Sequence, residues 1–114
     1  MAQLSIRIDF GPGFRVGPGK IQLLEQIAAL GSISAGGRAL GMSYRRAWEL
    51  VDELNRMFGK PVVKSKTGGK KGGGATLTAL GLSLISRYRA MVLAAEAATE
   101  SHIAALAREA AEVS

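Results

Sequence analysis

The stretch SISAGGRALGMSYRRAWELVDELNRMFG, residues 32–59, carries the start and stop signals of two helices. Ser34 can cap a short first helix, and Gly41 permits a tight turn after it. Ser43 can then cap a longer helix over residues 44–58. A short helix, a turn that contains glycine and a longer helix form a helix-turn-helix, in which the second helix enters the major groove of DNA. This stretch therefore predicts a DNA-reading motif.

The longer helix is predicted to be amphipathic. Its apolar side chains recur at the three- and four-residue spacing that lines one face of a helix. The predicted buried stripe consists of Ala47, Leu50, Val51, Leu54 and Phe58. In the shorter helix, the run AGG at residues 35–37 lacks bulky side chains, so the two helices can cross closely.

The segment before this motif predicts a strand, a turn and a helix. Residues 4–10 alternate apolar and polar side chains, as a half-buried strand does, and residues 11–19 are punctuated by glycine and proline. They do not match a Walker-type phosphate loop, because Phe14 and Ile21 stand where glycine and Ser or Thr are needed. We therefore expect a turn, followed by a helix over residues 20–30 that a glycine ends. The predicted apolar face of this helix contains Ile21, Leu24, Ile27, Ala28 and Leu30.

Two short strands, over residues 61–66 and 75–78, follow the motif and predict a hairpin. The stretch TGGKKGGGAT, residues 67–76, joins them; its five glycines and two lysines exclude a tight two-residue turn. Thr78 is the predicted cap of a long helix over residues 79–111. At 1.5 Å per residue this helix is about 50 Å long, more than one small domain covers, so its distal half needs a partner helix.

Positive charge is concentrated in the middle of the chain. The formal net charge of the 114 residues is +6. Residues 38–78 hold nine Lys or Arg against three Asp or Glu, so the whole excess of +6 lies there. A localised basic excess is typical of proteins that bind a polyanion, although a solvated basic surface has the same composition.

Composition makes several other classes of protein unlikely candidates for this chain. Its length suits one domain with a modest core. The chain has no cysteine and a single histidine, His102, which cannot alone build a zinc site or a Ser-His-Asp triad. No apolar run approaches the roughly 20 residues that span a bilayer, and the first residues lack the pattern of a signal peptide. We expect a cytoplasmic protein that is not an enzyme, with no metal, no cofactor and no membrane contact.

A helix, a helix-turn-helix and a basic hairpin in this order predict a winged helix. The fold class is therefore mainly α (α+β), a winged helix-turn-helix with a long C-terminal dimerisation helix. Residues 1–78 would form the DNA-binding domain, with the helix-turn-helix over 34–58 and the wing over 61–78, and residues 79–114 would form the dimerisation helix.

The candidate DNA-binding residues fall in two places, the first turns of the longer helix and the hairpin. A helix in the major groove presents its N-terminal residues to base edges and phosphates, and arginine can bond guanine O6 and N7 together. The hairpin tip needs bare backbone to approach the sugar-phosphate surface and positive charge to hold it there. The candidates are Ser43, Tyr44, Arg45, Arg46, Trp48, Glu49, Lys66, Thr67, Gly68, Lys70 and Lys71.

Several candidates have a second interpretation. Arg45 and Arg46 could be ordinary solvated arginines of a helix. Trp48, one turn beyond Tyr44, could equally pack at the edge of the core. Glu49 could accept a hydrogen bond from cytosine or, like the other acidic residues of this helix, face solvent.

The motifs also carry a resemblance to a known family. The run ISAGGRALGMSYRRAWELVDELNRMFG, followed by TGGKKGGGATLTALG, closely resembles the N-terminal DNA-binding domain of ModE-type molybdate-responsive transcriptional regulators over residues 18–92. The stretch GMSYRRAWELVDELNRMFG is more distantly similar in layout to LysR-type regulators. The resemblance implies a dimer, held largely by helices flanking the DNA-binding module, that regulates molybdate transport or molybdoenzyme genes. Molybdate sites in that family lie in downstream domains, so none is expected in this chain.

The leading hypothesis is a dimeric, sequence-specific regulator that binds double-stranded DNA and forms a homodimer through its C-terminal helix. The alternative is a nonspecific basic nucleic-acid (DNA or RNA) binding module, for which the basic middle of the chain would suffice.

Overall fold

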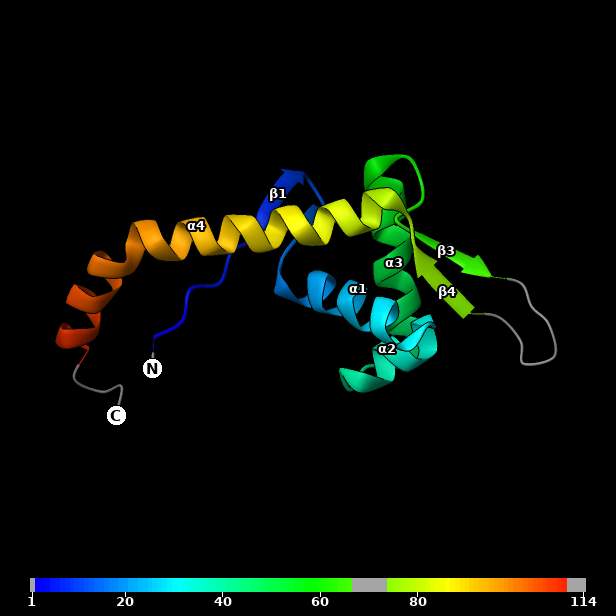
Figure 1. The fold of residues 1–114 in the computed structure, drawn as a ribbon, viewed down its shortest axis with the longest axis horizontal. Coiled ribbons are helices and arrows are strands. Elements are labelled where there is room, and N and C mark those ends of the chain that lie inside the picture. The colour runs from blue at the N-terminus through cyan, green and yellow to red at the C-terminus, as the bar shows by residue number, and fades with distance from the viewer. Residues whose placement is uncertain (1, 67–73, 111–114) are drawn as a thin grey trace.

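The computed structural model describes residues 2–66 and 74–110 (Figure 1). The fold is mainly helical, with two small antiparallel hairpins and a long C-terminal helix, which confirms the predicted fold class. The elements in chain order are β1 (Ile8–Gly11), β2 (Phe14–Val16), α1 (Pro18–Leu30), α2 (Ile33–Ala39), α3 (Tyr44–Phe58), β3 (Val63–Lys66), β4 (Gly74–Leu77) and α4 (Ala79–Glu109).

The N-terminal hairpin differs from the sequence prediction. The strand begins at Ile8 rather than residue 4, and Phe14–Val16, expected within a turn, forms a second strand antiparallel to the first. Gly11 and Gly13 both have positive φ, which lets the chain reverse over two residues. The strand signal of Phe14–Val16 is only three residues long, too short for its pattern to stand out between glycines and prolines.

Helix α1 lies at the centre of the core. It starts at Pro18, a residue favoured in the first turn, and ends at Gly31, whose φ of 82° is left-handed. Its buried residues are Ile21, Leu23, Leu24 and Ile27. The predicted face was wrong in two positions, because Ala28 and Leu30 are exposed. Leu23 is buried instead, since α1 packs against α2 and α3 and also against β4 and α4.

Helix α2 begins two residues earlier than predicted. Its cap is Ser32, whose hydroxyl accepts a hydrogen bond from the backbone N–H of Ala35 at 3.0 Å. The predicted cap, Ser34, lies inside the first turn, and its hydroxyl accepts from Arg38 at 3.1 Å. Ser32 directly follows the glycine that ends α1 and has the extended backbone of a cap, so α2 begins at once after α1.

The small residues of α2 permit two close crossings. A Cβ at Gly36 would lie 2.8 Å from Cγ1 of Ile27 in α1, and a Cβ at Gly37 would lie 2.7 Å from the Cβ of Ala47 in α3. Both distances are shorter than real contacts allow, so α2 fits between its neighbours only with glycine there. The predicted close crossing is confirmed. The turn to α3 contains Gly41, with a φ of 73°.

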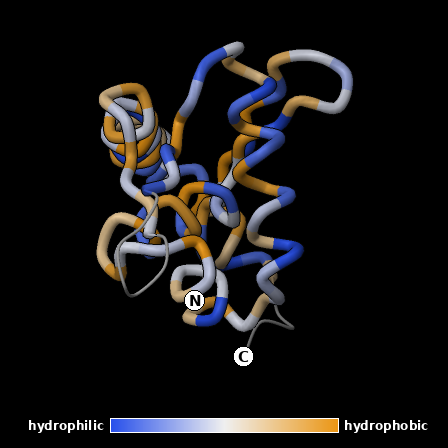
Figure 2. The backbone as a smooth tube through the Cα atoms, turned by 90° about the vertical axis from the view of Figure 1, so that its right-hand side faces the viewer, coloured by the Kyte–Doolittle hydropathy of each residue, from blue (hydrophilic) through white to orange (hydrophobic). Residues whose placement is uncertain are grey.

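Helix α3 has the predicted bounds and the predicted cap. Ser43 accepts from the backbone N–H of Arg46 at 3.0 Å. Ala47, Leu50, Val51 and Leu54 are buried, and Phe58 is half-buried with its ring edge-on to that of Phe10, the two centroids 5.7 Å apart. Hydrophilic and hydrophobic residues alternate along this helix in Figure 2.

Strands β3 and β4 pair antiparallel from Val63↔Leu77 to Lys66↔Gly74. The hairpin is attached through β4 to the C-terminal end of α1, because the N–H of Ala75 donates to the carbonyl oxygen of Gly31 at 2.8 Å. A Cβ at Gly74 would lie 2.8 Å from that same oxygen. Gly74, one of the five glycines of residues 67–76, therefore lets β4 pack closely against the end of α1.

Helix α4 starts at its predicted cap, Thr78, and is continuous for 31 residues. Its first turns pack on the core through Leu84 and Tyr88, and the rest extends away from the helix-turn-helix and curves at its far end (Figure 1). The molecule is therefore elongated, 57 × 29 × 23 Å.

Candidate nucleic-acid interface

The first turn of α3 presents its side chains to solvent. Arg45 and Arg46 follow the Ser43 cap, and the Arg45 side chain is 88% exposed. The positive end of the helix dipole lies at the same turn. Cationic side chains and backbone N–H groups thus meet at one place, an arrangement that attracts phosphates and acceptor groups on bases.

Glu49 contacts both arginines. Its carboxylate lies 3.4 Å from Nε of Arg45 and 3.7 Å from a terminal nitrogen of Arg46. Exposed ion pairs of this kind contribute at most about 1 kcal/mol, so DNA can replace them. Each arginine also retains N–H donors that Glu49 does not engage. We call these three residues the α3 charge cluster.

Two aromatic side chains extend the same surface. Tyr44 is 58% exposed and Trp48, one turn further along α3, is 48% exposed. Neither is a core residue, although Trp48 was open to that interpretation from sequence. Large apolar side chains this exposed are available for contact with a partner surface such as thymine methyl groups.

A groove of about 240 Å³ lies between the helix-turn-helix and the hairpin. It brings together Tyr44 and Lys66, two predicted site residues that are 22 positions apart in sequence. Four of its side chains carry hydroxyl groups, which suit phosphate oxygens. The lining residues are Ser32, Ile33, Ser34, Tyr44, Ser65, Lys66, Gly74 and Ala75.

The sequence prediction missed the serines of this groove. Ser65 follows the inward-facing Val63 by two positions, so strand alternation could have placed it on the side towards α2. Arg38 was also missed; it is held beside the groove by its hydrogen bond to Ser34. No sequence signal linked α2 to β3, because the contact depends on how the hairpin folds back.

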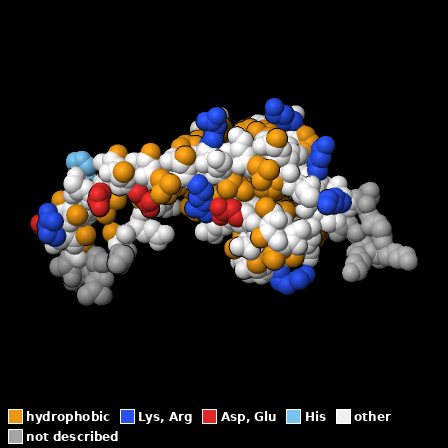
Figure 3. All heavy atoms as spheres, in the orientation of Figure 1, with side chains coloured by type: hydrophobic (Ala, Val, Ile, Leu, Met, Phe, Trp, Pro, Cys, Tyr) orange, Lys and Arg blue, Asp and Glu red, His pale blue; other side chains and the backbone are white. Residues whose placement is uncertain are grey.

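The remaining candidates lie on the hairpin. Lys64 and Lys66 are exposed on β3, and side chains of Lys and Arg gather on the half of the molecule that holds α2, α3 and the hairpin (Figure 3). Acidic side chains in that view lie mostly along α4. Thr67, Gly68, Lys70 and Lys71 lie outside the described residues.

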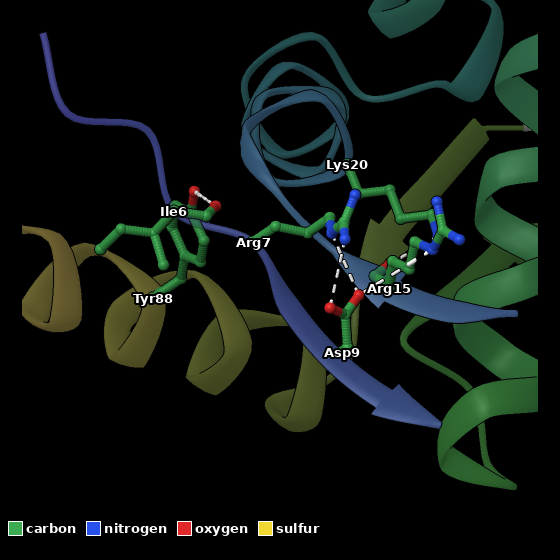
Figure 4. Close-up of polar contacts among 6 residues, drawn as sticks. All are labelled: Ile6, Arg7, Asp9, Arg15, Lys20 and Tyr88. Carbon is green, nitrogen blue, oxygen red and sulfur yellow. Dashed lines mark hydrogen bonds and ion pairs between the residues drawn. The ribbon is translucent and has the colours of Figure 1, made fainter. Parts of the chain in front are cut away.

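Helix α3 is held by an ion pair that sequence reasoning did not find. Glu53 was expected to face solvent, but its carboxylate lies 2.9 Å from Nζ of Lys20 in α1. Nζ also donates to the carbonyl oxygen of Arg15 in β2 at 2.6 Å, and the Lys20 side chain is only 11% exposed. Figure 4 shows Lys20 beside Arg15, with Arg15 and Arg7 around Asp9. Three elements thus meet at one ammonium group.

The first half of α4 is fixed to α1 by a second ion pair. Arg89 donates two hydrogen bonds to Glu25, at 2.7 and 2.9 Å, which lowers the pKa of the Glu25 carboxyl. The buried Tyr88 donates its hydroxyl hydrogen to the carbonyl oxygen of Ile6 at 2.7 Å (Figure 4), and burial raises the pKa of this phenol. The N-terminal segment is thereby attached to α4.

Other sites were sought in the part of the chain that the structure describes. Two open cavities, of about 520 and 310 Å³, lie between residues 2–6 and α4. Within residues 2–66 and 74–110, no three His, Cys, Asp or Glu side chains gather as a metal site would require. None of the described helices is long and apolar enough to cross a membrane.

A capped, arginine-bearing helix on a glycine turn, beside a two-stranded basic hairpin, defines a winged helix-turn-helix protein of the DNA-binding class. The chain belongs to the lysR family of bacterial regulatory helix-turn-helix proteins, whose pattern matches residues 19–82. This family consists of regulators and not of enzymes.

Comparison with individual proteins shows which members of this class the chain is similar to. It is 46% identical to the DNA-binding transcriptional dual regulator ModE of Escherichia coli over 71 residues, 62% of this chain and 27% of that protein. It is 46% identical to the molybdenum-pterin-binding protein MopB of Rhodobacter capsulatus over 79 residues, 69% of this chain and 29% of that protein. Identity to the molybdenum transport protein ModE of Azotobacter vinelandii is 32% over 100 residues, 88% and 36% of the two chains. The predicted resemblance is confirmed, and the chain spans about a third of the length of these relatives.

Proposed function

We propose that this chain is a dimeric, sequence-specific DNA-binding regulator that places α3 in the major groove of its operator. The observation that carries the proposal is the α3 charge cluster, exposed at the capped start of the second helix of a helix-turn-helix. Arg45 and Arg46 would bond base edges or phosphates, and Tyr44 and Trp48 would contact bases beside them.

The groove between α2, α3 and the hairpin would hold the DNA backbone. Its serine hydroxyls and Lys66 can donate to phosphate oxygens while α3 reads the bases. Lys64 and the hairpin-tip residues Thr67, Gly68, Lys70 and Lys71 would extend this contact along the backbone. Phosphate contacts fix register and orientation, and base contacts supply the specificity.

Dimerisation would occur through α4. Beyond Tyr88, α4 leaves the core and exposes large apolar side chains, among them Met91, Leu93 and Leu106. Burial against a second α4 would remove these side chains from water, at about 25 cal/mol per Å² of apolar surface. A dimer would present two α3 helices to two half-sites of one operator.

The relatives suggest which genes are regulated. Two of them are named for molybdenum transport or molybdenum-pterin binding. We therefore propose that the targets are genes of molybdate transport or of molybdoenzymes, and that the protein acts in the cytoplasm. The aligned region spans only a third of those relatives, and no molybdate site is proposed within these residues.

Selection of DNA from a random pool tests the proposal. We expect an enriched motif with two related half-sites, which binds at least 100-fold tighter than random DNA at 150 mM salt. Affinity that follows salt but not sequence would contradict the proposal and favour the nonspecific basic nucleic-acid module. The Arg45→Ala variant is a second arm: it should lose most of the selectivity.

A further inference from the structure

One peptide segment connects α3 to α4. Asn55 of α3 accepts hydrogen bonds from the backbone N–H groups of Val62 and Val63, at 2.8 and 3.5 Å, through its side-chain oxygen. Val62 is completely buried, so these donors have no access to water. Asn55 thus links α3 to the start of the hairpin by hydrogen bonds.

The same segment is bound from its other side by the start of α4. The backbone N–H of Thr78 donates to the carbonyl oxygen of Val62 at 3.0 Å. The Thr78 hydroxyl donates to the carbonyl oxygen of Pro61 at 2.8 Å, and it accepts from the N–H of Gly81 as the cap of α4. Val62 therefore gives its N–H to α3 and its carbonyl oxygen to α4.

Gly81 makes this contact close. A Cβ at Gly81 would overlap the carbonyl oxygen of Val62, so the first turn of α4 lies directly on the peptide backbone. Backbone in contact with backbone leaves no flexible side chain that could absorb a change in angle. The joint between α3 and α4 is short and rigid.

We infer that Asn55 and Thr78 are positioning residues that set the angle between α3 and α4, and thereby the half-site spacing that a dimer accepts. The inference rests on the proposed dimerisation through α4. From Thr78 to Met91, α4 rises roughly 20 Å at 1.5 Å per residue. A tilt of about 10° at the joint moves that point by roughly 3.5 Å, close to the 3.4 Å rise of one base pair. A joint that allowed this angle to vary would let the dimer bind operators whose half-site spacing differs by one base pair.

The test uses the full chain and operators built from the selected half-sites. Half-site spacing is varied by one and two base pairs in each direction, and a single half-site is included as a separate probe. Asn55→Leu removes the acceptor at similar volume, and Asn55→Asp retains an oxygen at that position. Thr78→Val removes the hydroxyl, and Thr76→Val is a matched control, because Thr76 is exposed on β4.

We expect wild type, Asn55→Asp and Thr76→Val to lose at least 10-fold in affinity for each base pair of altered spacing. Asn55→Leu and Thr78→Val should lose less than threefold per base pair, with single half-site affinity within twofold of wild type. Should Asn55→Leu fail to fold, as judged by circular dichroism, Thr78→Val carries the comparison.

Three results would overturn the inference. The first is a wild-type spacing profile in both Asn55→Leu and Thr78→Val. The second is an equal loss of affinity for single and paired half-sites in these variants. Such a result would mean that the contacts of Asn55 and Thr78 only stabilise the DNA-binding domain and do not affect half-site spacing. The third is a wild-type chain that binds one half-site as tightly as two; this result alone would also overturn the proposed dimer.

Discussion

Arg45 and Arg46 share one carboxylate, and the contact with Glu49 leaves most of their hydrogen-bond donors unengaged. We expect Arg45→Ala and Arg46→Ala each to weaken specific binding by about 1–3 kcal/mol, because each can form a bidentate bond to a base. Arg56→Ala is the matched control, since Arg56 lies at the other end of α3 and pairs with Asp52. Fluorescence anisotropy with operator DNA measures the effect. Wild-type affinity in both variants would contradict the assignment of α3.

The ion pair between Glu25 and Arg89 should make stability depend on pH. The pKa of Glu25 is lower in the folded chain than its usual value of 4.5, so the folded state favours the ionised form. This contribution is present above pH 4.5 and is lost as the pH falls through the lowered pKa. Both side chains are partly exposed, so we expect less than about 1 kcal/mol. Urea denaturation of wild type and Glu25→Gln at pH 7 and 3 measures it. An equal decrease in the free energy of unfolding from pH 7 to pH 3 in both proteins would show that the pair between Glu25 and Arg89 is not the source of the pH dependence.

Single residues were predictable where a local signal exists. Ser43 was identified as a cap because it follows a glycine turn and precedes an amphipathic run. The cap of α2 was predicted at Ser34 rather than Ser32, because two serines two positions apart give the same signal and only the end of α1 distinguishes them. The pairing of Lys20 with Glu53 joins residues 33 positions apart, and no local pattern reports such a contact.

Among the elements, α2 depends most on glycine. Gly36→Ala should destabilise the fold by about 1–3 kcal/mol, because its Cβ would lie 2.8 Å from Ile27. Gly19→Ala is the matched control: Gly19 lies in α1 with nothing within 4 Å of an added Cβ. The control should stabilise by about 0.4–1 kcal/mol, because alanine restricts the unfolded chain. Urea denaturation checks both, and similar midpoints for the two variants would refute the tight crossing.

The hairpin prediction concerns Lys70 and Lys71, which lie in the basic connection between β3 and β4. Replacing both by alanine should weaken binding to operator and random DNA by a similar factor. Each phosphate contact contributes about 0.9 to the slope of log K against log salt concentration, so the slope should fall by about two. The control is the double variant Arg87→Ala with Arg108→Ala, which removes two positive charges from α4. It should leave the slope of log K against log salt concentration unchanged. An unaltered slope in the lysine variant would show that these lysines do not contact phosphate.

Long helices and strands were predicted more accurately than short ones. The bounds of α3 and the start of α4 were correct, because caps and long amphipathic patterns act within a few residues. Strand β2 was missed, since three residues carry almost no periodic signal and its strand pairing is tertiary. The packing of Gly74 was not predictable for a related reason: the carbonyl oxygen that it faces belongs to Gly31, far away in sequence.

For the whole molecule, the length of α4 was predictable from its cap and its continuous helical pattern, and dimerisation through it stays a prediction. Met91→Glu combined with Leu106→Glu should convert a dimer into a monomer, because both side chains lie on one side of α4 and charges would enter the proposed helix contact. Leu82→Glu, also exposed on α4 but close to the core, should remain a dimer. Sedimentation velocity separates these states. Dimers in all three proteins would place the interface elsewhere.

The α3 charge cluster also has a consequence for how quickly a target is found. On random DNA, Arg45 and Arg46 gain less by leaving Glu49, because the base pairs that happen to face them seldom offer both arginines a matching pair of acceptors. The carboxylate also repels the phosphates, so each nonspecific encounter should be brief. A regulator that leaves wrong sites rapidly examines more of the genome per second. Glu49→Gln should therefore lengthen residence on random DNA and slow the search, even if it strengthens every individual encounter.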